Sequence, residues 1–192
     1  MISIEEIKKI NDSIPEIQSA RLVFRFITES DLEDIFEYAK NPKITEYLCW
    51  DYHKNKQDTL NFISQTNQSY SNSNDLVFGI ILKNKQKLIG SIGMHKINHI
   101  HSSCELGYVI NDKFWNKGYM TESVQTIVKF GFNELKLNRI IARIRLANIT
   151  SQKVLEKNGF IKEGLLREEM LVKGKYVDHF LFSILEKDFI NS

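Results

Sequence analysis

The sequence predicts a single α+β domain, and three features of its pattern support that prediction. The first part combines an alternating apolar run with amphipathic stretches, the middle holds successive strand-like runs, and the last part alternates helix-like with strand-like segments. The chain has 192 residues, 42% of them hydrophobic, which suits one packed domain because domains average roughly 150 residues. We expect residues 1–20 to form an N-terminal arm or short helix and residues 21–188 to form the domain.

The first part of the domain is expected to place one strand before several helices. Ser30 and Glu33 match the capping-box pattern, in which side chains at a helix start bond to unpaired backbone N–H groups. Asn41-Pro42 ends the helix that follows, because the residue before a proline disfavours helical geometry. The predicted elements are a strand at Arg21–Ile27, a helix with apolar positions at Leu32, Ile35, Phe36 and Ala39, a short helix at Ile44–Trp50 and a surface helix at Gln57–Tyr70.

A β-rich block follows, and the rest of the chain alternates helices with strands. The charged turn Lys83–Lys87 between two apolar runs predicts a hairpin, and Lys173-Gly174 predicts a second one near the C-terminus. If the strands on either side of the longest helix are parallel, their connection must be right-handed. The predicted strands are Leu76–Leu82, Leu88–Ile97, Cys104–Ile110, Arg139–Leu146, Phe160–Val172 and Tyr176–Leu185, and the predicted helices are Tyr119–Leu135 and Thr150–Lys157.

Composition excludes several classes of partner. With 26 basic and 24 acidic residues the net charge is +2, so no general attraction to nucleic acid or to an anionic membrane is expected. The N-terminus lacks the apolar centre of a signal peptide, and no segment approaches the roughly 20 apolar residues of a membrane span. Cys49 and Cys104 lie among apolar neighbours and are expected to be reduced core thiols. We therefore expect a soluble, cytoplasmic protein that binds neither nucleic acid nor membrane.

Two polar segments that each run into a helix are the strongest functional signal. They read W-N-K-G-Y-M-T-E-S at Trp115–Ser123 and N-I-T-S-Q-K-V-L-E-K-N-G-F at Asn148–Phe160. A helix start presents unpaired N–H groups and partial positive charge, so it attracts phosphate groups. The first segment has no Gly-Lys-Ser/Thr of a nucleotide triphosphatase and no three-glycine dinucleotide fingerprint. The pair indicates a cleft for another phosphate-bearing cofactor.

Shorter motifs elsewhere join these two segments in a recognisable set. They are R-L at Arg21-Leu22, I-G-S-I-G at Ile89–Gly93, E-L-G-Y-V-I at Glu105–Ile110 and D-H-F-L-F-S at Asp178–Ser183. Together the motifs resemble the GCN5-related N-acetyltransferases (GNAT), and within them the ribosomal-protein N-terminal acetyltransferase type, which is RimJ/RimL-like. The resemblance covers roughly Arg21 to Glu186. It implies a mixed, mostly antiparallel sheet of about seven strands, with helices on both faces and splayed central strands.

The resemblance implies acetyl-coenzyme A as cosubstrate and a primary amine as acceptor. The pantetheine arm is then expected between the strands Cys104–Ile110 and Arg139–Leu146, paired with backbone near Tyr108, Val109 and Ile110. The loop Asn116–Thr121 would hold the pyrophosphate, and Asn148 would contact the arm. The implied pyrophosphate residues are Asn116, Lys117, Gly118, Tyr119, Met120 and Thr121.

The reaction needs a proton acceptor, an oxyanion donor and a proton donor for the thiolate. Glu105 is the candidate base, acting through a water, with a pKa expected to be raised by desolvation; the alternative is a solvated strand residue or a structural ion pair. A backbone N–H near Val109 would stabilise the oxyanion. The position where many relatives carry a tyrosine is Leu155 here, so Ser151 becomes the proton donor; the alternative is a simple first-turn hydroxyl.

Two positions depart from the usual pattern of the family. Trp115 stands at the first position of its pyrophosphate motif, as is usual for the Rim type, and Met120 stands at the last, where alanine is typical. We expect Met120 to alter the seating of the cofactor without abolishing binding. Tyr47, Trp50 and Tyr70 are expected either to line an acceptor pocket or to belong to the core.

The acceptor is expected to be a protein or peptide N-terminal amine. A small amine (a polyamine, an amino acid or an antibiotic) and a non-catalytic acetyl-coenzyme A-binding module are the alternatives, and a homodimer is left open. No metal is expected. His95, His99 and His101 cross from a strand end into a loop without a matching cysteine or acidic cluster, so they are interpreted as surface or acceptor-side residues.

Overall fold

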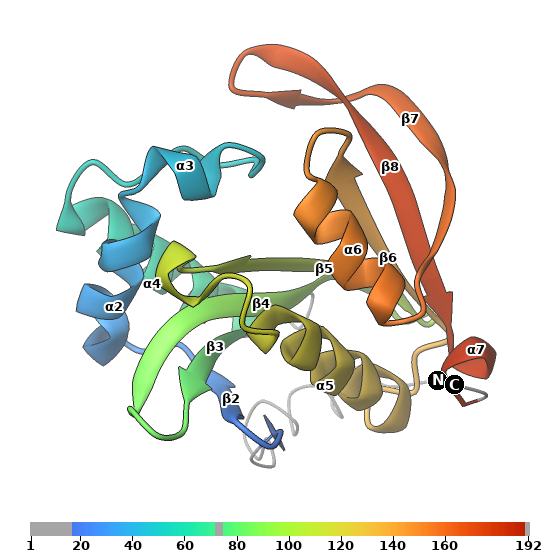
Figure 1. Cartoon of the computed structure of the whole chain (residues 1–192), viewed down its shortest axis with the longest axis horizontal. Helices are drawn as coiled ribbons and strands as arrows, with labels where there is room; N and C mark the ends of the chain where they lie inside the picture. The colour runs from blue at the N-terminus through green and yellow to red at the C-terminus, as the bar shows by residue number, and fades with distance from the viewer. Residues whose placement is uncertain (1–16, 72–74, 191–192) are drawn as a thin grey trace.

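An eight-stranded open sheet forms the centre of the molecule (Figure 1). A computed structural model describes residues 17–71 and 75–190. The strand order across the sheet is β1-β2-β3-β4-β5-β6-β8-β7. The strands are β1 (Ile17–Gln18), β2 (Leu22–Phe26), β3 (Leu76–Leu82), β4 (Lys87–Asn98), β5 (Ser103–Ile110), β6 (Arg139–Arg145), β7 (Ile161–Val172) and β8 (Lys175–Leu185).

Helices lie on both faces of this sheet. The α-helices are α2 (Leu32–Ala39), α3 (Pro42–Thr45), α4 (Lys56–Ser71), α5 (Tyr119–Asn133), α6 (Ile149–Lys157) and α7 (Glu186–Ile190), with short 3-10 turns at Glu29–Asp31 and Asp112–Phe114. The faces can be separated through β3, whose residues alternate between two buried clusters. Phe78 packs in the cluster that contains the apolar stripe of α5, whereas Val77 packs with α2 and α4. Within the described ranges, no helix is long and apolar enough to cross a membrane.

The sheet is antiparallel except where β5 meets β6. These two strands run parallel, and α5 connects them. They pair at Ser103↔Arg139, Cys104↔Ile140 and Glu105↔Ile141, although β5 continues to Ile110 and β6 to Arg145. The two strands therefore separate after Glu105, as the resemblance implied, and leave a gap within the sheet.

Most predicted elements are confirmed, and the differences lie near the N-terminus. Most of the expected arm lies outside the described residues, but Ile17–Gln18 forms β1 against β2 and brings the strand number to eight rather than about seven. The predicted capping box was placed wrongly: the Asp31 carboxylate accepts the Thr28 N–H at 2.8 Å. The short helix also starts earlier than predicted, because Pro42 occupies its first turn and Asn41 caps it.

Gly90→Ala should destabilise the protein, because β4 and β5 approach closely at this glycine. A Cβ at position 90 would lie 2.3 Å from Val109 O and 2.9 Å from Ile110 Cα, both backbone atoms that cannot move without shifting β5. We expect a loss of about 2–3 kcal/mol in the free energy of unfolding, measured by urea titration. Gly164→Ala in β7 is the matched control, since nothing lies within 4 Å of its Cβ position. Equal stability of the two variants would contradict the close approach.

Candidate active site

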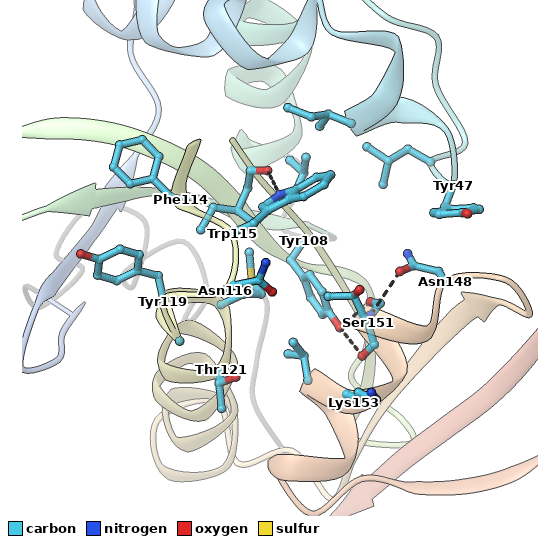
Figure 2. Close-up of a pocket in the computed structure, with 18 of the residues that line it drawn as sticks. Tyr47, Tyr108, Phe114, Trp115, Asn116, Tyr119, Thr121, Asn148, Ser151 and Lys153 are labelled. Atoms are coloured by element: carbon cyan, nitrogen blue, oxygen red, sulfur yellow. Dashed lines mark hydrogen bonds between the residues drawn. The ribbon is translucent and has the colours of Figure 1, made fainter. Parts of the chain in front are cut away.

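The gap between β5 and β6 opens into a cavity of about 560 Å³ (Figure 2), a volume typical of small-molecule sites. Its wall comes from both faces of the sheet, because α3 and the turn after it lie on one side and α5 and α6 on the other. The lining residues are Lys43, Ile44, Glu46, Tyr47, Leu48, Tyr108, Val109, Ile110, Phe114, Trp115, Asn116, Gly118, Tyr119, Met120, Thr121, Asn148, Thr150, Ser151, Lys153, Val154 and Lys157. The structure thus brings the predicted cofactor residues together, apart from Lys117.

The start of α5 forms one wall of the cavity. Gly118 is the N-cap residue and has a φ of 76°, and because glycine has no side chain the N-cap makes no side-chain hydrogen bond to the helix N–H groups. Asn116, two residues earlier, also has a positive φ of 59°. These two left-handed residues turn the chain sharply into the helix. The first turn of α5 therefore presents backbone donors and the positive end of the helix dipole at the cavity.

Ser151 and Tyr108 meet across the gap between the separated strands (Figure 2). The Tyr108 hydroxyl and Ser151 Oγ lie 2.7 Å apart, and either oxygen can donate in this contact. The Ser151 carbonyl, 3.2 Å from Tyr108 Oη, is a second acceptor for the single Tyr108 proton. Burial raises the pKa of the Tyr108 phenol, so this side chain stays protonated. The sequence resemblance implied only backbone contacts for Tyr108. The structure adds a pair of hydroxyl groups on the cavity wall, which can give a proton.

The start of α6 forms the opposite wall. Asn148 is the N-cap residue, and its side-chain oxygen accepts the Ser151 N–H at 3.1 Å. Ser151 is thus both a first-turn residue and a cavity residue, so the two interpretations of its role are compatible. Leu155 occupies the position at which the family resemblance implied a tyrosine, and it is fully buried in the core.

Glu105 lies where β5 and β6 separate, but it does not line the cavity. Its carboxylate accepts hydrogen bonds from Arg143 at 2.6 Å and from Lys96 at 3.0 Å, and 17% of the side chain is exposed. Burial alone would raise the pKa of this carboxyl, but the Lys96 hydrogen bond and the Arg143 charge outweigh it and lower the pKa. The expected upward shift was therefore wrong, and the ion-pair interpretation describes the geometry.

Three lysines that the sequence analysis missed stand on the cavity wall. Lys153 and Lys157 lie four residues apart on α6, and Lys43 comes from α3. The i, i+4 spacing on a helix that follows the Asn148 cap was the available signal. Lys117, which was predicted, instead donates to the Lys113 carbonyl at 2.8 Å. The lysines that line the cavity are therefore Lys43, Lys153 and Lys157, and not the predicted Lys117.

The aromatic and cysteine predictions separate into confirmed and corrected ones. Tyr47 lines the cavity, whereas Tyr70 is buried and donates to the Val77 carbonyl, and Trp50 packs against the same core cluster. Cys104 is buried, and burial raises the pKa of its thiol. Cys49 is exposed, so its assignment to the core was wrong; it lies in the turn after α3.

Across residues 17–71 and 75–190, no three His, Cys, Asp or Glu side chains cluster as metal ligands.

Known proteins resemble this chain over most of its length. The acetyltransferase (GNAT) domain family matches residues 21–161. YoaA of Bacillus subtilis (strain 168), an uncharacterized N-acetyltransferase, is 32% identical over 90% of this chain and 97% of its own length. A solved acetyltransferase (GNAT family) from Bacillus anthracis is 32% identical, with a TM-score of 0.80 over 90% of this chain and 99% of that chain.

Two further relatives have named acceptors that differ from each other. The ribosomal protein uS5-alanine N-acetyltransferase of Escherichia coli (strain K12) is 26% identical over 92% of this chain and 94% of its own. The spermidine N(1)-acetyltransferase of Vibrio cholerae is 23% identical over 90% of this chain and 98% of its own.

Glu105→Gln should destabilise the protein by about 2 kcal/mol at pH 7, because it removes a partly buried carboxylate that accepts charge-assisted hydrogen bonds from Arg143 and Lys96. A carboxyl with a lowered folded-state pKa adds stability above its unfolded pKa, and loses it as pH falls through the folded pKa. The stability difference between wild type and variant, measured by urea unfolding, should shrink below about pH 4. The exposed Glu156 supplies the control variant Glu156→Gln; a pH-independent difference for Glu105→Gln would contradict the ion pair.

Proposed function

The chain belongs to the GNAT family of acetyltransferases, and we propose that it transfers the acetyl group of acetyl-coenzyme A to the α-amine of a peptide or protein N-terminus. As a family member it is an acetyl-coenzyme A-dependent N-acetyltransferase. The observation that carries the proposal is the cavity at the point where β5 and β6 separate. Because its wall comes from both faces of the sheet, donor and acceptor can approach from opposite sides and meet in the gap.

The donor side of the cavity fits acetyl-coenzyme A. In this proposal the uncapped start of α5 (Asn116–Thr121) binds the pyrophosphate, with Lys153 and Lys157 available to the remaining phosphate charge. Lys117, whose side chain turns to Lys113, contributes backbone only. The backbone groups of Tyr108–Ile110 that bond neither to β4 nor to Trp115 pair with the pantetheine arm, and Asn148 contacts the arm from the start of α6. Met120 is 8% exposed and lines the cavity, so in this proposal its side chain shapes the pyrophosphate site without blocking it.

The proposed reaction is a direct attack. The amine nitrogen bonds to the acetyl carbon while the carbon–sulfur bond breaks, and a backbone N–H near Val109 stabilises the oxygen charge. Ser151 gives its proton to the departing sulfur and takes one from Tyr108, which the 2.7 Å contact between the two hydroxyls supports. Solvent then returns a proton to Tyr108, while the proton that leaves the amine passes through Glu105 to solvent, so the proton count is restored. Glu105 accepts the amine proton through water. Its lowered pKa keeps it ionised, but also makes it a weak base.

A weak base favours an acceptor that loses its proton readily. At pH 7.5 roughly a third of an N-terminal α-amine is neutral, whereas on the order of 0.1% of a lysine-like amine is neutral. The charges on the cavity wall also favour an α-amine over a polyamine. The charged lining residues are three lysines (Lys43, Lys153 and Lys157) and one glutamate (Glu46). Such a wall disfavours a polycation. A small amine is the second candidate, because the spermidine enzyme is among the relatives. The homodimer and the cytoplasmic location stay predictions.

Acetyl-coenzyme A should raise the melting temperature, since it binds the folded chain. At a concentration 100-fold above Kd the stabilisation should be about 2.7 kcal/mol. Thiol release in the presence of acetyl-coenzyme A should then be faster with peptides bearing a free N-terminus than with N-blocked peptides, spermidine or aminoglycosides. A thermal shift without thiol release on any amine would favour a non-catalytic module, and preference for spermidine would overturn the α-amine assignment.

Ser151→Ala should lower kcat by about 100-fold, a typical loss for a general acid, while acetyl-coenzyme A still binds. Tyr108→Phe should lower kcat less, because Ser151 keeps its own hydroxyl. Ser183→Ala is the matched control, since Ser183 is also buried but bonds Glu163 at 2.7 Å and does not line the cavity. Initial rates at saturating acetyl-coenzyme A decide the matter; full activity of Ser151→Ala would remove Ser151 from the mechanism.

A further inference from the structure

We propose that Arg21 and Glu122 are positioning residues that hold the pyrophosphate-binding loop in its binding conformation. The loop is Asn116–Thr121, and the inference rests on the acetyl-coenzyme A site of the proposed function. Arg21 immediately precedes β2, and Glu122 lies in the first turn of α5. Neither residue lines the cavity, so both act through the loop and not by direct contact with the ligand.

Arg21 contacts the loop without lining the cavity. Its Nη1 donates to the Lys117 carbonyl at 3.0 Å. Its guanidinium lies 4.4 Å from the centre of the Tyr119 ring, within the range of a cation–π contact. A Cβ added at Gly118 would lie 3.4 Å from Arg21 Nη2, so the guanidinium also lies against this glycine. One side chain thus contacts three successive residues of the loop.

The bond to the Lys117 carbonyl fixes the direction of an N–H group. The peptide between Lys117 and Gly118 is trans, so its carbonyl oxygen and its N–H point in opposite directions. With the oxygen held by Arg21, the Gly118 N–H points away from Arg21, toward the cavity that Gly118 lines. The positive φ angles of Asn116 and Gly118 show that this peptide sits in an unusual local conformation. An outside contact that stabilises it preorganises an anion-binding donor.

Glu122 fastens Arg21 in place, and Arg21 in turn neutralises Glu122. The carboxylate accepts from Arg21 Nε at 2.6 Å, from the Arg21 backbone N–H at 2.9 Å and from Ser19 Oγ at 2.7 Å. Burial alone would raise the pKa of Glu122, but the hydrogen bonds from Ser19 and Arg21 lower it, so the group is ionised. An ionised carboxylate in the first turn of α5 would repel phosphate unless a cation offsets it.

The loss of Arg21 therefore has two consequences for acetyl-coenzyme A. The Lys117–Gly118 peptide is no longer held, and the Glu122 charge faces the anion seat without its partner. Arg21→Gln should raise KM for acetyl-coenzyme A by about tenfold, as for loss of a charge-assisted hydrogen bond. kcat at saturating acetyl-coenzyme A should stay near wild type, because the acceptor side and Ser151 are untouched.

Two further variants separate geometry from charge. Arg21→Lys keeps the cation but loses the planar fork that reaches Glu122 and Lys117 together, so KM should fall between wild type and Arg21→Gln. The double variant Arg21→Gln with Glu122→Gln removes both charges. It should regain part of the affinity, about threefold, because the repulsion is gone while the peptide is still unheld. Full recovery would overturn the positioning role and leave only a charge effect.

The matched control is Arg25→Gln in β2, the strand that begins directly after Arg21. Arg25 also forms a forked pair, to Asp31 at 2.7 and 2.8 Å, but Asp31 belongs to the 3-10 turn Glu29–Asp31 and not to the pyrophosphate-binding loop. The Arg25→Gln variant should have a lower melting temperature and an unchanged KM for acetyl-coenzyme A. If wild type fails to bind acetyl-coenzyme A by calorimetry, the proposed function itself fails. If wild type binds and Arg21→Gln binds equally well, or Arg25→Gln raises KM to the same extent, the positioning role is overturned.

Discussion

The end of the pairing between β5 and β6 at Glu105 and Ile141 is the constraint on which the rest of the site depends. Separating two strands exposes backbone groups that cost free energy if they are buried without partners. The protein satisfies one of them with a side chain, since Trp115 Nε1 donates to the Ile110 carbonyl at 2.9 Å. The contact between Tyr108 and Ser151 joins the two sides of the gap. Arg143 of β6 binds Glu105 of β5 at the point where the two strands begin to separate. The gap is thus braced, and its remaining backbone groups can serve a ligand.

The same gap divides the electrostatics of the molecule into two regions. On the α5 and α6 side, helix starts and lysines make the wall favourable for anions. On the opposite face, Glu105 belongs to a chain of alternating charges in which Arg143 also binds Glu169 at 2.5 Å. Each charge in that chain is offset by the next, so this face attracts neither strong cations nor strong anions. At such a balanced surface a neutral amine has a smaller desolvation penalty than a protonated one, which is consistent with the proposed acceptor.

Local pattern was enough to predict the elements, but not the partners that tertiary contacts supply. The strands from Leu76 onward and the helix start at Gly118 follow from apolar runs, turns and glycine, which act within a few residues. The pKa of Glu105 could not be predicted, because Arg143 lies 38 positions away in the chain. The Tyr108–Ser151 contact spans 43 positions and was invisible for the same reason. The wrong placement of Cys49 arose because apolar sequence neighbours do not ensure burial in a turn.

The N-terminal contact extends this argument to affinity. Arg21 and Lys117 are 96 positions apart, yet the fold brings them together because the start of α5 lies against the edge of the sheet formed by β1 and β2. Residues that hold the loop from outside the cavity leave all of its ligand-binding groups free. Because the loop is already ordered, less conformational entropy of the loop is lost when the ligand binds. In the proposed scheme, Arg21 and Glu122 act on donor affinity at one edge of the sheet. The proposed proton transfers take place at the gap, through Ser151, Tyr108 and Glu105. Within the described part of the chain these two groups share no hydrogen bond, so in the proposed scheme cofactor binding and chemistry can change independently.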